Sequence, residues 1–290
     1  LLMQSVLPQI TPNSDTRALV YDAKQDVLSI IHGMQLEAPI VILNPFDSRS
    51  AAWDMAADIT SPGAAQQLAR ILIPENKRSP QPYFSDAARQ ILKGVILTFM
   101  QRFPGSWTFR DVVLALKSKE VLIQLFRSCP DTEGLCRHFD NTLTGQNVMA
   151  TIVSHMEPYE IVASLWHHTS SKVSLEDWVK SNFILVLGND ERLRAAIDPI
   201  NQAIFERASE LLLSSSESET RRTWLFLDEA RAAGELRALP RLLTKGRSKG
   251  ACVVLGFQDI EGLRAVFKRE EASEIVGLCA NKVLLRTDDP

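Results

Sequence analysis

The stretch Thr223-Trp224-Leu225-Phe226-Leu227-Asp228-Glu229 decides the fold, because a short apolar run ends abruptly in two adjacent carboxylates. A run of about four to eight apolar residues is typical of a strand that is buried on both faces. Acids that follow such a strand lie at its carboxyl end, where open α/β sheets bind their ligands. The sequence therefore predicts an α/β protein with Asp228 and Glu229 at its ligand site.

An acid pair in this position suits the hydrolysis of a nucleoside triphosphate. In P-loop enzymes the first acid reaches Mg²⁺, and the second can accept a proton from the attacking water. We predict that Asp228 holds Mg²⁺ through water and that Glu229 is the general base. The pair alone also permits a purely structural interpretation.

A second apolar run, Ala251–Phe257, predicts another buried strand, and Gln258 follows it. If the two strands are adjacent and parallel, Gln258 emerges beside Asp228 and Glu229. A neutral amide there can hydrogen-bond a terminal phosphate or orient water without altering the charge balance. We predict that Gln258 senses the γ-phosphate.

Arg247 lies on the connection that precedes this second strand, between Lys245 and Lys249. A guanidinium group suits phosphate, and an arginine delivered by a neighbouring subunit stabilises transition-state charge in nucleotide hydrolases. We predict this role for Arg247, which requires an oligomer with sites at its subunit interfaces. Three alternatives stay open: one of the lysines plays this part, all three cations contact DNA, or the segment is a solvated basic loop.

Strand and helix patterns alternate near the two ends of the chain, which predicts crossover connections and a parallel sheet. The predicted strands are Arg17–Tyr21, Ile40–Leu43, Phe183–Leu187, Thr223–Leu227, Ala251–Phe257 and Lys282–Arg286. Helical patterns in these parts include Asp198–Leu213 and Gly234–Leu243. The interval from about Asp54 to Lys180 contains only helical patterns and is predicted to be a helical insertion without strands: Ala64–Leu72, Asp86–Arg102, Phe109–Leu116, Val121–Arg127 and Gly145–Met156.

The composition bounds the function. The chain has 290 residues, of which 45% are hydrophobic, so it can bury one substantial core. The formal net charge of −3 gives no general attraction to nucleic acid, and any DNA contact needs a local basic surface. No window approaches the length of about eighteen uncharged apolar residues that a transmembrane helix needs.

In order and spacing, these segments resemble the motor domain of type IV secretion coupling proteins. These are the DNA-transfer ATPases of conjugation, and they are related to the FtsK and HerA DNA pumps. The segments that carry the resemblance are Trp224–Glu229, Thr244–Arg247, Gly256–Gln258, Ala18–Asp26, Ile42–Asp47 with Trp53, and Leu285–Pro290. Ala23 stands where the family commonly has proline.

The resemblance implies a RecA-like P-loop NTPase core with a mostly parallel central sheet and an inserted all-α domain. It divides the chain into residues 1–53 and 181–290 of the nucleotide-binding domain and residues 54–180 of the all-α domain. It also implies ATP and Mg²⁺ as cofactors. The turn after the first strand places Asp22 and Lys24 on the side of the site, where either can support nucleotide binding; a plain turn is an equally good interpretation.

The same resemblance implies partners and a location. The relatives are homo-hexameric rings, with DNA held in the central channel by contacts that are indifferent to sequence. The all-α domain is expected to recognise a relaxase or another secreted protein. Secretion-channel ATPases and membrane components are expected as further partners. The expected location is the cytoplasmic face of the bacterial inner membrane, with membrane helices outside this chain.

One departure from the family pattern is large. The phosphate-cradling loop requires Gly-x-x-x-x-Gly-Lys-[Ser/Thr], and no glycine of this chain is followed by lysine. The apolar stretch Leu1–Leu7 matches the helix that follows this loop in the family. Either the sequence was cut there or the loop has been lost; we favour a cut, because a natural start inside a helix without an initiator methionine is implausible. The chain alone is then not expected to hydrolyse ATP.

The leading hypothesis is an ATP-driven DNA translocase that couples relaxase–DNA substrates to a type IV secretion channel. The alternative is a non-hydrolysing docking or scaffold protein on the same fold, which recruits protein substrates through the helical insertion. A HerA-like cytoplasmic DNA pump is a third possibility. A Gly-Lys-[Ser/Thr] motif before Leu1 would separate the first hypothesis from the second.

Overall fold

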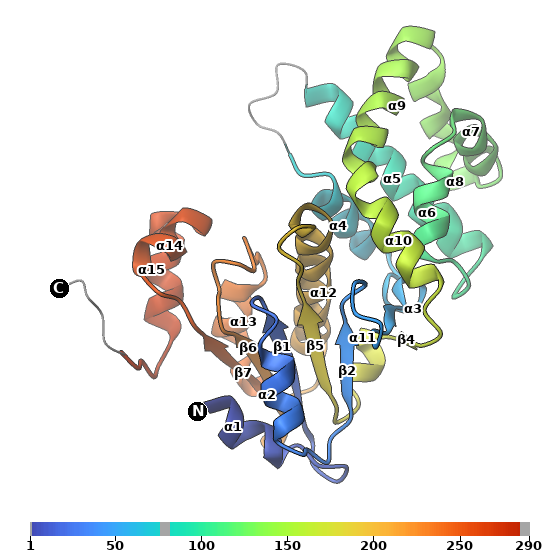
Figure 1. Cartoon of the computed structure of the whole chain (residues 1–290). Helices are drawn as coiled ribbons and strands as arrows, with labels where there is room; N and C mark the ends of the chain where they lie inside the picture. The colour runs from blue at the N-terminus through green and yellow to red at the C-terminus, as the bar shows by residue number, and fades with distance from the viewer. Residues whose placement is uncertain (1, 76–81, 285–290) are drawn as a thin grey trace.

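The computed structural model describes residues 2–75 and 82–284, and its centre is a five-stranded parallel sheet (Figure 1). The strands are β1 (Thr16–Asp22), β2 (Ile40–Leu43), β5 (Ile184–Gly188), β6 (Arg222–Leu227) and β7 (Ala251–Leu255). Their spatial order is β2-β5-β1-β6-β7, so β1 lies in the middle. Because every pairing is parallel, all five carboxyl ends lie at one edge of the sheet.

Apolar side chains on both faces explain why these segments are strands. Leu19 of β1 pairs with Leu185 on one side and with Leu225 on the other, and all three are fully buried. Since neighbouring side chains point to opposite faces, the continuous burial of β1 requires a cover on each face. β7 is only half-buried along its length, as an edge strand of the described sheet.

Helices cover both faces of the sheet. One face packs against α1 (Leu2–Val6), a short 3₁₀ turn (Leu7–Gln9) and α2 (Val27–Gly33). The opposite face packs against α12 (Arg194–Ser214) and α13 (Leu239–Lys245). After β7 come α14 (Ile260–Val266) and α15 (Arg269–Leu278), which lie near the β7 side of the molecule (Figure 1).

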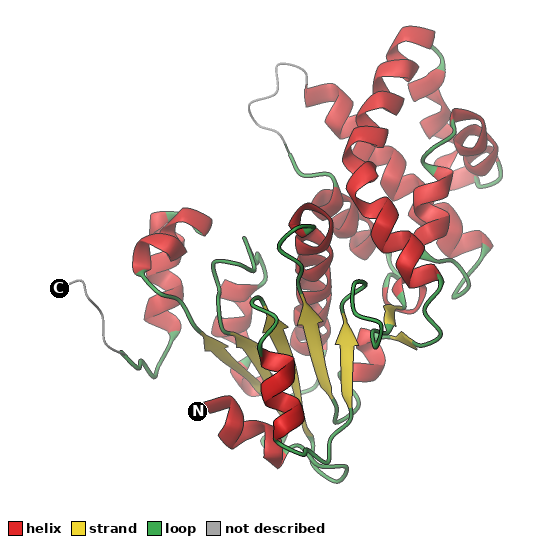
Figure 2. Cartoon of the chain, viewed as in Figure 1, coloured by secondary structure: helices red, strands yellow, loops and turns green. Residues whose placement is uncertain are grey.

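A helical body stands beside the sheet and its covering helices (Figure 2). Its helices are α3 (Met55–Asp58), α4 (Pro62–Leu72), α5 (Pro82–Arg102), α6 (Phe109–Ala115), α7 (Lys119–Arg127), α8 (Pro130–Glu133), α9 (Thr142–Met156) and α10 (Glu160–His167). The short helix α11 (Leu175–Trp178) follows this body in the chain and packs against α12. Ile91 and Phe126 of this body belong to the same apolar cluster as Leu185 and Leu225 of the sheet. The core of the insertion is therefore continuous with one face of the sheet.

The chain enters and leaves the helical body through a two-stranded parallel pair, β3 (Ala52–Trp53) and β4 (Lys172–Val173). The buried carboxylate of Asp58 joins the two crossings. It accepts hydrogen bonds from Trp53 Nε1 (2.6 Å), Ser174 Oγ (2.9 Å) and the Leu175 amide (2.8 Å). Burial raises the pKa of this carboxyl above its ordinary value, and the hydrogen bonds oppose that shift.

The structure confirms the α/β class with a parallel sheet and a helical insertion, and it corrects three details. β4 lies inside the interval in which we expected no strand, because a two-residue strand leaves no periodicity. The helix predicted over Gly234–Leu243 begins only at Leu239, and Gly234 has a φ of +72°, which excludes it from a right-handed α-helix. Of the strand predicted over Lys282–Arg286, residues 282–284 have no regular structure, and Leu285 and Arg286 lie outside the described residues. Within the described ranges, no helix is long and apolar enough to cross a membrane.

Candidate active site

The carboxyl ends of β6 and β7 bring together the acids and the amide that the sequence singles out. β6 and β7 pair in parallel with Leu227 opposite Leu255, so Asp228 and Gly256 follow side by side. Gln258 Nε2 donates a hydrogen bond to Glu229 Oε2 (3.3 Å). Asp228 is exposed, and its carboxylate has no hydrogen bond or ion pair among the described residues. The geometric condition for a shared site is met at Glu229 and Gln258, and the role of each residue stays a prediction.

Gly256 is necessary for this approach of the two strand ends. Its amide donates to the Leu227 carbonyl (2.8 Å), and its carbonyl accepts from the Ala230 amide (2.9 Å). A Cβ atom at position 256 would lie 2.2 Å from the carbonyl oxygen of Asp228, which is closer than atoms can pack. The glycine thus lets the backbone of β7 lie directly against the residue that carries the first carboxylate.

β1 contributes the turn that carries Asp22 and Lys24. Asp22 is buried, and its carboxylate accepts hydrogen bonds from the amides of Val27 and Leu28 (both 3.3 Å) at the start of α2. Burial raises the pKa of Asp22, and these hydrogen bonds oppose the shift. Lys24 Nζ instead lies 3.8 Å from Glu229 Oε2. The structure therefore places Lys24 at the acid pair and Asp22 beneath the turn, where it fixes α2.

Sequence reasoning missed the residues that hold the loop after Glu229. Tyr21 Oη and Arg194 Nη2 both donate to the carbonyl of Ala232 (3.1 and 3.0 Å). Asn189 Nδ2 in turn donates to Tyr21 Oη (3.4 Å). Burial, followed by the charge of Asp198, raises the pKa of Tyr21, so its hydroxyl remains a donor at neutral pH. No motif reports these contacts, because their acceptor is a backbone carbonyl.

Arg247 lies at the other end of β7, on the turn that precedes the strand. Its side chain is exposed and makes no hydrogen bond or ion pair with any residue that the structure describes. The loop before β6 supports this turn, because the Ser218 amide donates to the Ser248 carbonyl (3.0 Å) and Lys249 lies 3.8 Å from Glu217. Arg247 is therefore held at the opposite edge of the sheet from Glu229 of the same chain.

Comparison with known proteins decides the family. The family model of the type IV secretion-system coupling protein DNA-binding domain matches residues 2–290. The chain belongs to this family. Coupling protein TraD of Escherichia coli (strain K12) is 20% identical over 278 residues, which are 93% of this chain and 37% of TraD.

Solved structures of the conjugative coupling protein TrwB share the coupling-protein fold. An unbound form superposes with a TM-score of 0.69 at 20% identity, over 91% of this chain and 60% of that one. TrwB in complex with ADP and Mg²⁺ gives a TM-score of 0.66 at 18% identity, over 91% of this chain and 68% of that one. The chain thus spans less than two thirds of TraD and of the unbound TrwB chain. The TrwB structures show a RecA-like core with a helical domain.

The acids of this coupling-protein domain fit a magnesium ion that is shared with phosphates. Among the described residues, no three His, Cys, Asp or Glu side chains form a cluster that could hold a metal. Mg²⁺ needs no such cluster, since it keeps several waters and commonly uses one or two carboxylates together with substrate phosphates. The exposed, unpaired carboxylate of Asp228 meets that requirement.

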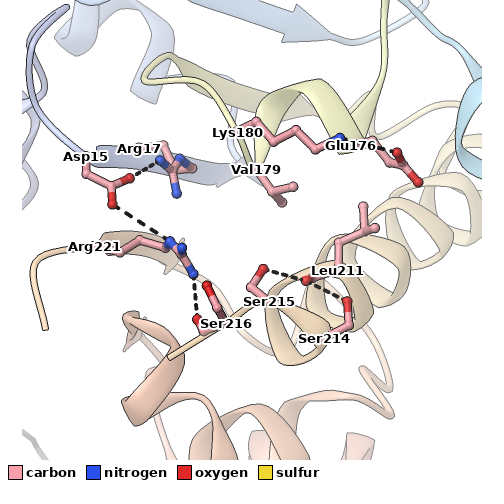
Figure 3. Close-up of a pocket in the computed structure, with 10 residues that line it drawn as sticks. All are labelled: Asp15, Arg17, Glu176, Val179, Lys180, Leu211, Ser214, Ser215, Ser216 and Arg221. Atoms are coloured by element: carbon pink, nitrogen blue, oxygen red, sulfur yellow. Dashed lines mark hydrogen bonds and ion pairs between the residues drawn. The ribbon is translucent and has the colours of Figure 1, made fainter. Parts of the chain in front are cut away.

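A separate cavity of about 490 Å³ lies at the amino ends of β1 and β6, away from the acid pair (Figure 3). Arg17 and Asp15 form an ion pair on its wall (2.6 Å), and Arg221 lies 3.9 Å from the same aspartate. Lys180 lies 3.6 Å from Glu176 on the facing side. The charges of this cavity are therefore largely paired with one another, in contrast to Asp228.

Proposed function

We propose that this domain is part of an ATP-hydrolysing motor that moves DNA toward a type IV secretion channel. The observation that carries the proposal is the meeting of Glu229 and Gln258, next to the unpaired carboxylate of Asp228, at the carboxyl ends of β6 and β7. Ligands of open α/β sheets bind at this edge. TrwB has been solved with ADP and Mg²⁺ and with the ATP analogue ADPNP, which supports a nucleotide as the ligand.

The side chains of the site have distinct roles in this proposal. Bound Mg²⁺ would neutralise phosphate charge. Asp228 would hold that ion through water, Glu229 would accept a proton from the attacking water, and Gln258 would donate its amide hydrogens to the terminal phosphate. Asp22 supports nucleotide binding indirectly: it accepts hydrogen bonds from the first amides of α2 and so holds the turn between β1 and α2 in place. Tyr21 and Arg194 hold the loop that follows Glu229.

Arg247 completes the site of a neighbouring subunit. Its exposed, unpaired guanidinium and its place at the edge opposite Glu229 support action on another copy of the chain. A head-to-tail contact of this kind closes into a ring under cyclic symmetry, and we propose a homo-hexamer. DNA then passes through the channel of the ring, held by phosphate contacts that do not depend on sequence.

The helical body is the proposed site of cargo recognition. In this division, residues 54–180 form the all-α domain, and residues 1–53 and 181–290 form the nucleotide-binding domain. A relaxase–DNA complex or a secreted protein is the proposed cargo, with channel ATPases and membrane components as partners at the cytoplasmic face of the inner membrane. The continuous core between helical body and sheet supports mechanical coupling of cargo binding to the motor.

A hydrolysis assay of the full-length protein tests this function. We expect Mg²⁺-dependent ATP hydrolysis that DNA stimulates, and its loss in Asp228→Asn. Asp140→Asn is the matched control, because Asp140 is an exposed acid of the helical body. Hydrolysis that survives unchanged in Asp228→Asn would overturn the proposed site.

One observation favours a second candidate function. These 290 residues contain no Gly-Lys-[Ser/Thr] motif, so they do not supply a phosphate-cradling loop themselves. A full-length protein that binds cargo but neither binds nor hydrolyses ATP would be a docking or scaffold protein on the motor fold. The 290-residue chain on its own is expected to be inactive in either case.

A further inference from the structure

A hydrogen-bond donor and a cation both approach a single oxygen of Glu229. Gln258 Nε2 lies 3.3 Å and Lys24 Nζ lies 3.8 Å from Oε2 of this carboxylate. The Glu229 side chain is 16% exposed, whereas the side chain of Lys24 is 55% exposed. The three residues come from strands that lie side by side in the sheet. Lys24 follows β1, Glu229 follows β6 and Gln258 follows β7.

The turn that carries Lys24 is fixed on both sides of the lysine. On one side, Asp22 accepts the amides of Val27 and Leu28 with its two carboxylate oxygens. On the other, Gln25 adopts a left-handed backbone conformation (φ +61°), and its side-chain amide donates to the Asn189 carbonyl (2.5 Å). A non-glycine residue in this conformation costs free energy, so the surrounding contacts must hold the turn in place.

We propose that Lys24 is a positioning residue for the general base. Its ammonium group fixes Oε2 of Glu229 and leaves Oε1 free to accept a proton from water. This inference rests on the proposed function, and it assigns Lys24 a role different from that of a nucleotide ligand. Lysine acts here as a point charge, so arginine can replace it if the positive charge alone is needed.

The test compares Lys24→Met, Lys24→Arg and Lys268→Met in the full-length protein, with kcat and the KM for ATP measured at saturating DNA. Lys268 is the control, because it is an exposed lysine without a described partner. We expect Lys24→Met to lower kcat about fivefold, the rate equivalent of an exposed ion pair, with little change of KM. Lys24→Arg should restore most of the rate, and Lys268→Met should behave as the wild type.

Two results would overturn the inference. If Lys24→Met raises the KM for ATP and leaves kcat unchanged, Lys24 is a nucleotide ligand. If Lys24→Met has the kinetics of the wild type, Lys24 has no role in hydrolysis. Glu229→Gln and the wild type, measured in parallel, separate this failure from that of the proposed function. If Glu229→Gln is inactive while Lys24→Met is unaffected, only the positioning role is wrong. If Glu229→Gln hydrolyses ATP normally, Glu229 is not the base and the positioning role falls with it; if the wild type itself does not hydrolyse ATP, the proposed function fails.

Discussion

Gln258 Nε2 donates to Glu229 Oε2 across 3.3 Å, although the two residues are 29 positions apart in the chain. The bond connects the ends of two neighbouring parallel strands and crosses the edge at which α/β sheets bind ligands. In this arrangement the side-chain amide of Gln258, which we expect to contact phosphate, is hydrogen-bonded to Glu229, the proposed general base. A terminal phosphate bound between them would compete with Glu229 for the same donor.

Replacing Gly256 with alanine should damage the site through the backbone. The added Cβ would lie 2.2 Å from the Asp228 carbonyl oxygen, so β6 and β7 must separate at the end that carries the acids. We expect a loss of about 2 kcal/mol in the free energy of unfolding, measured by denaturant titration. Gly33→Ala is the matched control, because nothing lies within 4 Å of its added Cβ. Equal stability of the two variants would refute the close approach at Gly256.

Glu206 predicts a pH dependence of stability. This buried carboxylate accepts from the Ala238 amide (2.7 Å) and from Gln67 Nε2 (3.2 Å), and burial raises its pKa. The native state therefore binds this proton more tightly than the unfolded state does. The stabilising contribution is largest below the unfolded pKa of Glu206 and is lost as the pH rises through the higher folded value.

Glu206→Gln removes this titration. Its amide oxygen can still accept from the Ala238 amide, and its amide nitrogen can donate to Gln67 once the side-chain amide of Gln67 has turned over. We expect the variant to gain stability relative to the wild type as the pH rises above about 4.3, the ordinary pKa of glutamate, as measured by thermal unfolding at each pH. Glu274→Gln, at an exposed position of α15, is the control. A constant difference between Glu206→Gln and the wild type across this range would contradict the prediction.

Arg247 should act on the site of the next subunit. Arg247→Ala is expected to lower ATP hydrolysis by roughly 10³-fold or more, the range of arginine fingers. Mixed with inactive Glu229→Gln subunits, it should regain activity, because sites form that combine an intact Glu229 with an arginine from the neighbour. At equal amounts, about a quarter of the interfaces of a cyclic ring would be complete.

The control for this mixing experiment is Arg70→Ala, which removes an exposed arginine of the helical body and should retain full activity. Mixtures of Arg247→Ala and Glu229→Gln that stay as inactive as their components would show that the arginine does not act between subunits.

The sequence predicts the sheet and the strand-end acids well, because each rests on a local pattern. An apolar run that ends in Asp228 and Glu229, and another that ends before Gln258, imply proximity as soon as the two strands are taken as parallel neighbours. The position of Arg247 at the opposite edge follows from the same topology, since it precedes its strand rather than following it.

Other contacts leave no local pattern. Asp58 and Ser174 are 116 residues apart. They meet only because the chain leaves the helical body next to the point at which it enters, where β3 pairs with β4. Tyr21 and Arg194 converge on the carbonyl of Ala232, an acceptor that every residue carries. The contact of Lys24 with Glu229 depends on the conformation of one left-handed turn residue, Gln25, which periodicity does not specify.

The rate of ATP hydrolysis by Glu229→Gln in the full-length protein tests the central claim most directly, with Glu235→Gln, an exposed acid of the same loop, as control. We predict that kcat falls by about 10²–10⁴-fold while ATP still binds, because glutamine keeps the shape of the side chain but cannot accept the proton. Glu235→Gln should retain the wild-type rate. Undiminished hydrolysis by Glu229→Gln would contradict the account.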